Sequence, residues 1–268
     1  MKERNSRQSF LGPNLDKSFS EVRIGIVGLG GGGSQIVQQL AHVGFLNYVI
    51  ADPDVVEESN LTRLFGATVR DANDAVLKVD VAKRLIVGLQ PEANFAAVTT
   101  RWQDCPEALK GCHIIVGCVD TFAGRRELEA FARRHMAIYI DLGMDVWKGD
   151  DNQPVMGGQV FVSLPGKPCL QCLGILNEDN LAKEALAYGA AGGRPQVVWA
   201  NGVIASTAVG RIVDIVFGWT GRSSAPACMS YDGNREEVKP HWKLRNLTVS
   251  QCPHYPAEAV GHPVFSKL

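Results

Sequence analysis

The chain has 268 residues, of which 46% are apolar, and a formal net charge of −1. These values predict one large α/β domain with a substantial core and argue against a general nucleic-acid-binding surface. Residues 1–20 are polar, without an apolar signal segment, and Pro13 disfavours regular structure, so we expect an irregular arm and a cytoplasmic protein with no membrane span. Seven cysteines, an odd number, indicate reduced thiols or metal ligands rather than a disulfide framework.

A strand, a glycine-rich turn, a helix and a second strand follow one another between residues 22 and 60. Gly28, Gly30 and Gly33 stand at G-x-G-x-x-G spacing directly after the first apolar run. Glycines there permit a tight turn and let a phosphate approach the backbone, while the helix amino terminus presents unpaired N–H groups. Asp52 ends the second strand about twenty residues later, where it could hold a ribose hydroxyl. The segment therefore predicts an adenine-nucleotide site, with a tight turn alone as the alternative.

Apolar strands and amphipathic helices continue to alternate as far as residue 141. The expected elements are a helix over 78–89, a strand over 94–100, a strand over 113–120, a helix over 124–135 and a strand over 137–141. This alternation is typical of a parallel sheet covered on both faces, so we predict an α/β, Rossmann-like, doubly wound fold. Ligands of such sheets bind beyond the carboxyl ends of the strands, where we expect Asp52 and Asp120 to converge on one ligand.

The pattern changes after residue 145, where we expect an antiparallel C-terminal extension of the sheet. Its predicted elements are a strand over 159–163, a helix over 180–188, a Gly/Pro-rich loop over 189–195, an apolar helix over 197–217 and short strands over 229–232 and 244–249. The apolar helix contains Asn201, Arg211 and Asp214, and these polar side chains favour a buried helix over a membrane span.

Several short motifs are spread along almost the whole chain. They are Arg7–Gln8, Gly28–Gly33, Asp52–Asp54, Ser59–Arg63, Lys78, Cys118–Asp120, Cys169–Cys172 and Gly202–Ser206. Together they resemble the ThiF/MoeB/HesA family, the bacterial relatives of ubiquitin-activating enzymes. The resemblance implies a single adenylation domain over 1–268. It would comprise an arm over 1–20, a nucleotide-binding half over 21–145, and a half over 146–268 with a zinc site, a crossover loop and a protein-substrate surface.

The resemblance implies an enzyme that uses ATP and Mg²⁺ to adenylate the carboxyl terminus of a ubiquitin-like protein with a glycine tail, releasing pyrophosphate. Such an enzyme would serve protein conjugation, with a conjugating enzyme as partner, or a sulfur-transfer pathway. Attack of a carboxylate on the α-phosphate brings two anionic groups together, so cations must neutralise the developing charge. By resemblance, Arg63 and Lys78 supply that charge, and Asn60 hydrogen-bonds the phosphates.

Acidic residues and one arginine complete the implied site. A hard cation prefers carboxylate oxygen, which makes Asp120 the expected magnesium ligand. Asp120 also follows a buried strand, where an unpaired charge would be costly. Asp52 would hold the ribose, and Asp54 would lie near the phosphates or metal, or only shape its turn. Arg7 corresponds to a family arginine that reaches the active site of the neighbouring subunit, so the resemblance implies a functional homodimer.

Cys169-x-x-Cys172 has the spacing of half a zinc site. The family's second half is another Cys-x-x-Cys, in which Cys252 matches the first position here and Tyr255 stands at the second. The resemblance therefore implies zinc on three thiolates, with His254 as the nearest candidate for the fourth ligand. The alternative is a metal-free junction that contains buried thiols.

The crossover loop over 188–195 contains no cysteine, whereas family members that form a thioester carry one there. The activated acyl group would then pass directly to an external thiol or amine, or to another side chain of the enzyme, and the sequence leaves these routes open. Three further cysteines, Cys105, Cys112 and Cys118, are expected in the core.

Three other functions fit parts of the pattern. Adenylation of a non-protein substrate such as a modified tRNA base is disfavoured by the near-neutral charge and the cysteine pair. An NAD-dependent oxidoreductase would have no use for Asn60, Arg63 or Asp120. A non-catalytic partner that keeps the nucleotide-binding fold is disfavoured because Arg63, Lys78 and Asp120 are all retained.

Overall fold

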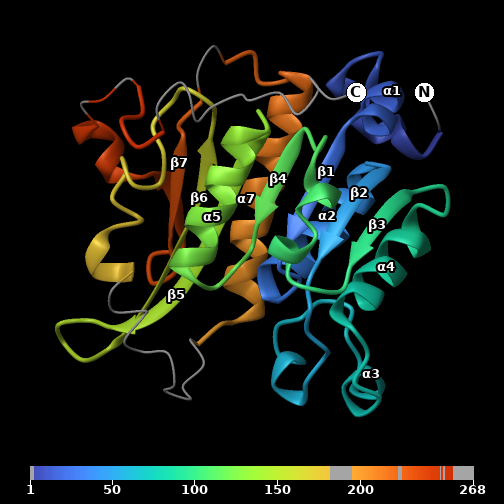
Figure 1. The fold of residues 1–268 in the computed structure, drawn as a ribbon, viewed down its shortest axis with the longest axis horizontal. Helices are drawn as coiled ribbons and strands as arrows, with labels where there is room; N and C mark the ends of the chain where they lie inside the picture. The colour runs from blue at the N-terminus through green and yellow to red at the C-terminus, as the bar shows by residue number, and fades with distance from the viewer. Residues whose placement is uncertain (1–2, 182–194, 223–224, 248, 250, 256–268) are drawn as a thin grey trace.

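The computed structural model describes residues 3–181, 195–222, 225–247, 249 and 251–255. Its centre is an eight-stranded sheet with the order β3-β2-β1-β4-β5-β6-β7-β8 (Figure 1). The strands are β1 (Arg23–Val27), β2 (Asn47–Ala51), β3 (Asn94–Val98), β4 (Ile114–Gly117), β5 (Ile138–Lys148), β6 (Pro154–Ser163), β7 (Cys228–Asp232) and β8 (Glu237–Pro240). Strands β1 to β5 pair in parallel and β5 to β8 pair antiparallel. The predicted Rossmann-like sheet with an antiparallel extension is therefore confirmed.

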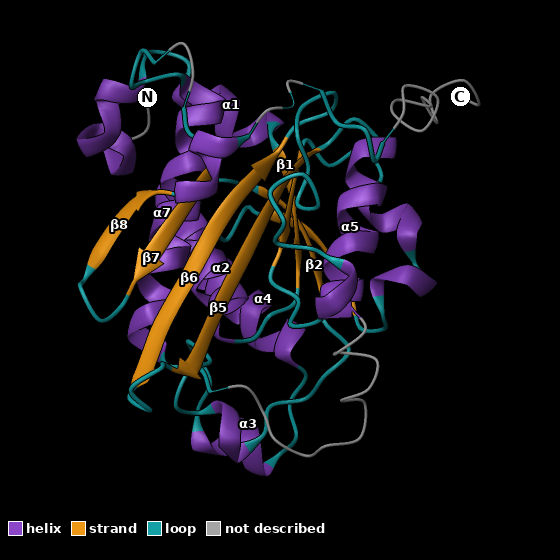
Figure 2. Cartoon of the chain, turned by 90° about the vertical axis from the view of Figure 1, so that its left-hand side faces the viewer, coloured by secondary structure: helices purple, strands orange, loops and turns teal. Residues whose placement is uncertain are grey.

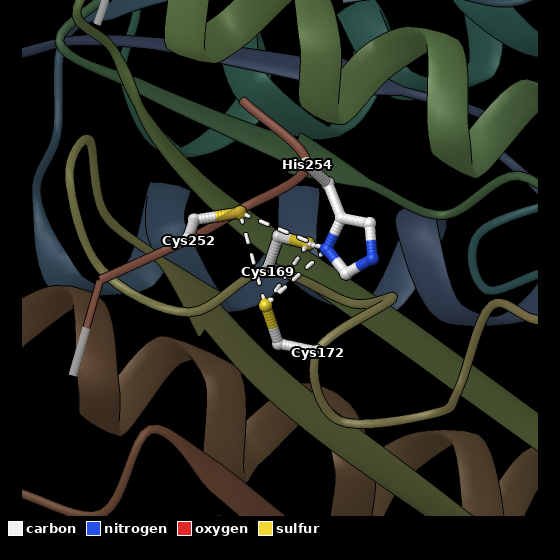
Figure 3. Close-up of side chains that lie close together, drawn as sticks. All are labelled: Cys169, Cys172, Cys252 and His254. Atoms are coloured by element: carbon white, nitrogen blue, oxygen red, sulfur yellow. Dashed lines mark hydrogen bonds between the residues drawn. The ribbon is translucent and has the colours of Figure 1, made fainter. Parts of the chain in front are cut away.

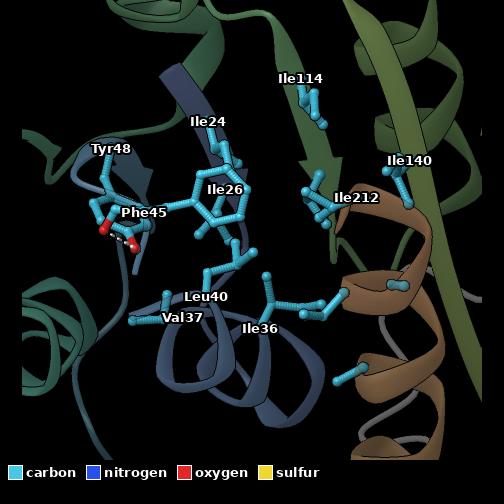
Figure 4. Close-up of a cluster of buried hydrophobic side chains, with 14 of the residues drawn as sticks. Ile24, Ile26, Ile36, Val37, Leu40, Phe45, Tyr48, Ile114, Ile140 and Ile212 are labelled. Carbon is cyan, nitrogen blue, oxygen red and sulfur yellow. Dashed lines mark hydrogen bonds between the residues drawn. The ribbon is translucent and has the colours of Figure 1, made fainter. Parts of the chain in front are cut away.

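Helices cover both faces of the sheet. They are α1 (Leu15–Glu21), α2 (Gly31–Val43), α3 (Val69–Asn73), α4 (Lys78–Leu89), α5 (Phe122–Arg134) and α7 (Val198–Phe217), with 3-10 helices η1 (Glu3–Leu11), η2 (Glu58–Asn60), η3 (Trp102–Asp104), η4 (Pro106–Leu109) and η5 (Trp242–Asn246). On one face, Ile36 and Leu40 of α2 pack with Ile24 and Ile26 of β1 and Ile212 of α7 (Figure 4). Helix α5 packs on the opposite face. Apolar parallel strands require this double cover.

Helix α7 is long and apolar enough to cross a membrane by length and composition alone. In the described chain it packs along α2 and against β5 and β6. Ile204 and Ile212 are buried on that side, whereas Trp199, Ser206 and Gly210 are exposed on the other. The predicted buried helix is thus buried on one face, as expected for a helix that covers a sheet.

Strands β5 and β6 form a longer ribbon than the predicted segments 137–141 and 159–163. Figure 2 shows this ribbon with β7 and β8 at the edge of the sheet. The register pairs Gly143 with Gln159 and Asp145 with Gly157. The extension carries the sheet beyond the nucleotide-binding half and provides further surface beside the glycine-rich turn.

The described part of the arm, residues 3–20, is mostly helical rather than irregular, so that expectation is wrong. Leu15 and Phe19 recur at helical spacing in α1 and are buried in the main core. The Phe19 ring packs edge-on against Phe45 with 5.1 Å between ring centroids. Pro13 lies in the turn between η1 and α1, where it breaks no helical hydrogen bond.

The expected strand over 244–249 is also wrong in its described part, because residues Trp242–Asn246 form η5. His241 caps this turn through its Nδ1 atom, which accepts from the Lys243 N–H group at 3.2 Å. The Lys243 ammonium donates to the carbonyl of Gly174 at 3.1 Å. These local and long-range hydrogen bonds stabilise a turn that apolar patterning does not predict.

Two further expectations concern the middle of the chain and its cysteines. The predicted helix over 180–188 and the loop over 189–195 lie almost entirely outside the described residues. Cys112 is buried as expected and Cys118 is half-buried, but Cys105 is exposed. Cys105 lies between η3 and η4, in a surface turn, which explains why its core assignment fails.

Candidate functional site

The glycine-rich turn connects β1 directly to α2. Gly28 has a φ of +87°, and a Cβ atom there would lie 2.6 Å from the carbonyl oxygen of Cys118. A Cβ atom on Gly33 would overlap the carbonyl oxygen of Gly28. Gly30 is the N-cap residue of α2, and a Cβ atom there would meet nothing within 4 Å. Gly28 and Gly33 are thus required by packing, whereas Gly30 keeps the helix amino terminus open to the cavity.

Asp52 holds the turn from the carboxyl end of β2. Its Oδ2 accepts from the Leu29 N–H group at 2.6 Å, and its Oδ1 accepts from the Asp54 N–H group at 2.9 Å. The side chain is 5% exposed, and this burial raises the pKa of Asp52, an effect that the two hydrogen bonds and the positive charge of Lys78 oppose. Each oxygen keeps a free lone pair, so Asp52 can shape the turn and also accept from a ribose hydroxyl.

Two predicted cations lie close to this turn. Lys78 is the first residue of α4, and its ammonium donates to the Asp54 carboxylate at 2.8 Å. A cation at a helix amino terminus opposes the helix dipole, so the carboxylate of Asp54 stabilises an otherwise unfavourable position. The Arg63 guanidinium donates to the carbonyl of Ser59 at 2.7 Å, which orients it from the loop after η2.

Asp120 lies in the loop between β4 and α5, next to Thr121, which caps α5 by accepting from the Gly124 N–H group. The structure places Asp120 on the exposed wall of the cavity. The Asp120 carboxylate is therefore not buried, contrary to the expectation from the buried strand before it. Strand β4 ends at Gly117, and the chain has reached the surface by residue 120. An exposed carboxylate at this edge can still meet a hydrated cation.

One cavity of about 1180 Å³ brings most of the predicted nucleotide-site residues together. Those that line it are Gly28, Gly30, Asp52, Asp54, Arg63, Lys78 and Asp120. The cavity continues across the antiparallel extension to Trp147 and Trp242. Both cations and carboxylates line the cavity, as expected for a site that binds a polyphosphate with a metal ion.

Asn60 and Arg7 do not line this cavity. Asn60 is 6% exposed, and its Oδ1 accepts from the Glu57 N–H group at 3.3 Å, which caps η2. Arg7 is exposed on η1, where the neighbouring Gln8 donates to the carbonyl of Val43 at the end of α2. That is the helix end opposite to the glycine-rich turn, so within its own chain Arg7 is remote from the cavity.

Two buried groups beside the cavity were missed by the sequence patterns. Arg125 pairs with Asp141, with 3.4 Å between Nε and Oδ1, and donates to the carbonyl of Leu142 at 2.7 Å. Nothing in the sequence distinguishes Arg125 from the other arginines of α5. Asn201 of α7 also lines the cavity and is 4% exposed. In the sequence Asn201 is one of three polar residues noted in an apolar helix, and nothing there assigns it to the site.

An ion pair between the buried Asp71 and the exposed Arg84 holds the loop of Arg63 against α4. Arg84 donates to both oxygens of Asp71 at 2.9 and 2.7 Å, and it also donates to the carbonyl of Gly66. Thr68 and Asp71 form a capping box at the start of α3, a spacing visible in the sequence. The hydrogen bonds from Arg84, aided by Thr68, lower the pKa of Asp71 well below its usual range.

We expect Asp71→Asn to lower the free energy of unfolding by about 1.5–3 kcal/mol, the usual size for hydrogen bonds to a charged group. Because the pKa of Asp71 is lowered in the folded protein, the loss is complete above about pH 4 and shrinks as pH falls below that value. Urea unfolding of the wild-type protein and of Asp71→Asn, at pH 7 and at pH 3, measures this loss of unfolding free energy. Asp74→Asn is the control, since its pair with Arg70 is exposed. Equal effects of the two substitutions would contradict the prediction.

A second cluster lies on the loops beyond β6 (Figure 3). Cys169, Cys172, Cys252 and His254 bring three thiols and one imidazole together, with all ligand atoms within 4.8 Å of one another. The Sγ atom of Cys172 lies 3.7 Å from the Sγ atom of Cys169 and 3.8 Å from the Sγ atom of Cys252. The Nδ1 atom of His254 lies 3.4, 3.4 and 4.0 Å from the three sulfurs. A tetrahedral zinc ion requires about 3.8 Å between sulfurs and about 3.6 Å between sulfur and nitrogen, so the donor set fits zinc.

Tyr255 is not one of the clustered donors and packs against α5 instead. Its ring lies over the Arg133 guanidinium, 4.9 Å from the centroid. Arg133 also donates to the carbonyl of Pro168 at 3.0 Å and pairs with Glu129, which accepts from the Leu170 N–H group. The residue at the family's fourth cysteine position thus joins a buried network that anchors the cysteine loop to α5, and His254 completes the cluster.

The sheet order, the glycine-rich turn and the polar cavity define a Rossmann-like α/β protein with an antiparallel extension and a Cys₃His cluster. The model of the ThiF family matches residues 3–254, and the chain belongs to this family.

Relatives with named activities share about a quarter of their residues with the chain. It is 27% identical to the sulfur carrier protein ThiS adenylyltransferase of Bacillus subtilis, over 94% of this chain and 71% of that protein. It is 28% identical to the molybdopterin-synthase adenylyltransferase of Escherichia coli, over 88% and 89%. It is 29% identical to the SAMP-activating enzyme E1 of Haloferax volcanii over 61% of this chain, and the match spans only 57% of that enzyme.

Solved structures share the fold. The chain superimposes on E. coli MccB with a TM-score of 0.73 and 17% identity, covering 94% of this chain and 73% of that one. At this level of identity the likeness speaks for the fold alone.

Proposed function

We propose that this chain is an ATP-dependent adenylyltransferase that activates the C-terminal carboxylate of a ubiquitin-like or sulfur-carrier protein and releases pyrophosphate. The observation that carries the proposal is the convergence of Asp52, Arg63, Lys78 and Asp120 on one cavity around the glycine-rich turn. Relatives that match over most of the chain are a sulfur carrier protein ThiS adenylyltransferase and a molybdopterin-synthase adenylyltransferase.

Each side chain has a role that suits its position. The α2 amino terminus and Gly30 would receive the phosphates, and Asp52 would accept from the ribose. Lys78 and Arg63 would neutralise the charge that develops when the carboxylate oxygen attacks the α-phosphate and the bond to pyrophosphate breaks. Asp120 would hold Mg²⁺, which supplies further positive charge to the phosphate oxygens.

Zinc at the Cys₃His cluster would have a structural role, because four protein ligands close its coordination sphere. The zinc would link the loop that bears Cys169 and Cys172 to the segment that bears Cys252 and His254. We place the protein in the cytoplasm, where thiols stay reduced and available to metal. A conjugating enzyme or a sulfur-pathway partner would receive the activated product.

A homodimer would supply Arg7 to the partner's cavity. The support is the exposed position of Arg7 on η1, remote from its own cavity, together with the exposed Val198 and Trp199 at the start of α7. A protein that sediments as a monomer while fully active would exclude this arrangement.

Exchange of labelled pyrophosphate into ATP tests the proposed function. We expect exchange only when a small protein with a terminal Gly-Gly is supplied, because the reverse reaction requires the acyl-adenylate. The matched control is the same small protein with its last glycine removed. Tight binding of NAD together with no exchange would overturn the proposal in favour of an oxidoreductase, and exchange driven by a nucleoside would indicate a non-protein substrate.

A further inference from the structure

Asn201 is a buried amide in the first turns of α7, directly beside the amino terminus of α2. A Cβ atom on Gly31 would overlap its Nδ2 atom, and a Cβ atom on Gly32 would lie 3.9 Å from its Oδ1 atom. The side chain therefore lies against the first turn of α2, and the absence of a side chain at Gly31 makes room for it. Asn201, Gly31 and Gly32 all line the large cavity.

The Nδ2 group of Asn201 is a buried donor, and it has no hydrogen-bond partner among the described residues. A buried donor that remains unpaired costs free energy, and such groups in native proteins usually have a functional reason. The adjacent buried residues of α7, Ala200, Ile204 and Ala205, are apolar, so packing alone would have been served by an apolar residue.

The surroundings of this donor favour an anion. Helix α2 has 13 residues, and its first N–H groups and its dipole attract negative charge at the end that Asn201 faces. Lys78 and Arg63 line the same cavity, and so do Asp52, Asp54 and Asp120, so the attraction for an anion beside Asn201 comes from the field of the helix amino terminus. A neutral amide donor adds a directional hydrogen bond to this field.

We propose that Asn201 donates from Nδ2 to an oxyanion bound at the amino terminus of α2. Given the proposed function, the oxyanion is a phosphate oxygen of ATP or the carboxylate of the acyl substrate. Asn201 is then a binding residue contributed by α7, and Gly31 is required because any larger residue would displace it.

Asn201→Leu separates this role from a packing role. Leucine has a similar shape and no unpaired donor, so the ligand-free protein is expected to unfold at the same temperature or higher. Its affinity for the oxyanion is expected to fall about 10- to 100-fold. Asn201→Asp, which adds a negative charge at the same place, is expected to bind more weakly still. The control is Thr207→Val, because the Thr207 hydroxyl only donates to the Val203 carbonyl within α7.

Two measurements distinguish the sources of the oxyanion. Calorimetric titration with ATP alone reports on the phosphate, and the KM of the acyl substrate in pyrophosphate exchange reports on the carboxylate. Weakened ATP binding supports the inference and identifies a phosphate oxygen as the ligand. Unchanged ATP binding with a raised KM supports it and identifies the carboxylate. If Asn201→Leu does not fold, Asn201→Ala and Gly31→Ala are tested in the same way.

If the wild-type protein is active but these variants keep both their ATP affinity and their KM for the acyl substrate, the proposed role of Asn201 is wrong. Failure of the wild-type protein to bind ATP or catalyse exchange would instead overturn the proposed function, and this inference with it.

Discussion

Lys78→Met is expected to slow ATP–pyrophosphate exchange by at least about 100-fold, the usual effect of removing one preorganised charge from a transition state. The Lys78 side chain is 12% exposed and its ammonium is held by Asp54, so its position is set before ligand binds. Methionine keeps the length of the side chain and removes only the charge. Steady-state exchange at saturating ATP gives the effect on kcat, and titration of ATP gives the effect on KM.

Lys83→Met is the matched control, because Lys83 lies on the same helix but is exposed and does not line the cavity. We expect that variant to exchange pyrophosphate at the wild-type rate. Wild-type exchange by Lys78→Met would remove Lys78 from the proposed chemistry, and a rise in KM without a loss of kcat would limit it to nucleotide binding.

Removal of one ligand from the Cys₃His cluster is expected to lower the free energy of unfolding more than Asp71→Asn does. Loss of a metal site is among the few changes that exceed about 4 kcal/mol, which for a chain of this size lowers Tm by about 8–16 °C. We expect one zinc per wild-type chain by elemental analysis and substantially less in Cys172→Ser and His254→Ala. The cluster joins loops that are far apart in sequence, so its loss releases both from α5 and β6.

Cys105→Ser is the control for these variants, since Cys105 is exposed and distant from the cluster in sequence. It should retain both its zinc and its Tm. If His254→Ala binds zinc as well as the wild-type protein, then His254 is not the fourth ligand. If the wild-type protein binds no zinc, the cluster is a metal-free group of thiols.

Local sequence patterns were sufficient to predict much of the secondary structure of the nucleotide-binding half. The spacing of Gly28, Gly30 and Gly33 after an apolar run predicts a strand–turn–helix, because the backbone conformation of a tight turn depends on the residues within it. The helix over 78–89 was predicted with the boundaries that α4 has in the structure. In both cases the signal is a short-range periodicity, so no distant contact was needed to read it.

Local patterns failed where distant contacts decide the structure. Residues 3–20 are mostly helical because Phe19 packs in a buried position against Phe45, and residues 242–246 form a turn because Lys243 hydrogen-bonds to Gly174. Hydrophobic patterning does not encode such partners. Asp120 was expected to be buried, but the end of a strand in the sequence does not reveal where the chain meets solvent.

The sequence by itself determined the α/β class, the glycine-rich turn, the end of the strand that precedes Asp52, and the Cys169–Cys172 pair, because each of these depends on residues that are neighbours along the chain. Only the tertiary structure decided that Cys252 and His254 meet the Cys169–Cys172 pair, and that Asn201 meets Gly31. Those pairs form when segments from different parts of the chain pack together, and the geometry of that packing depends on the whole core.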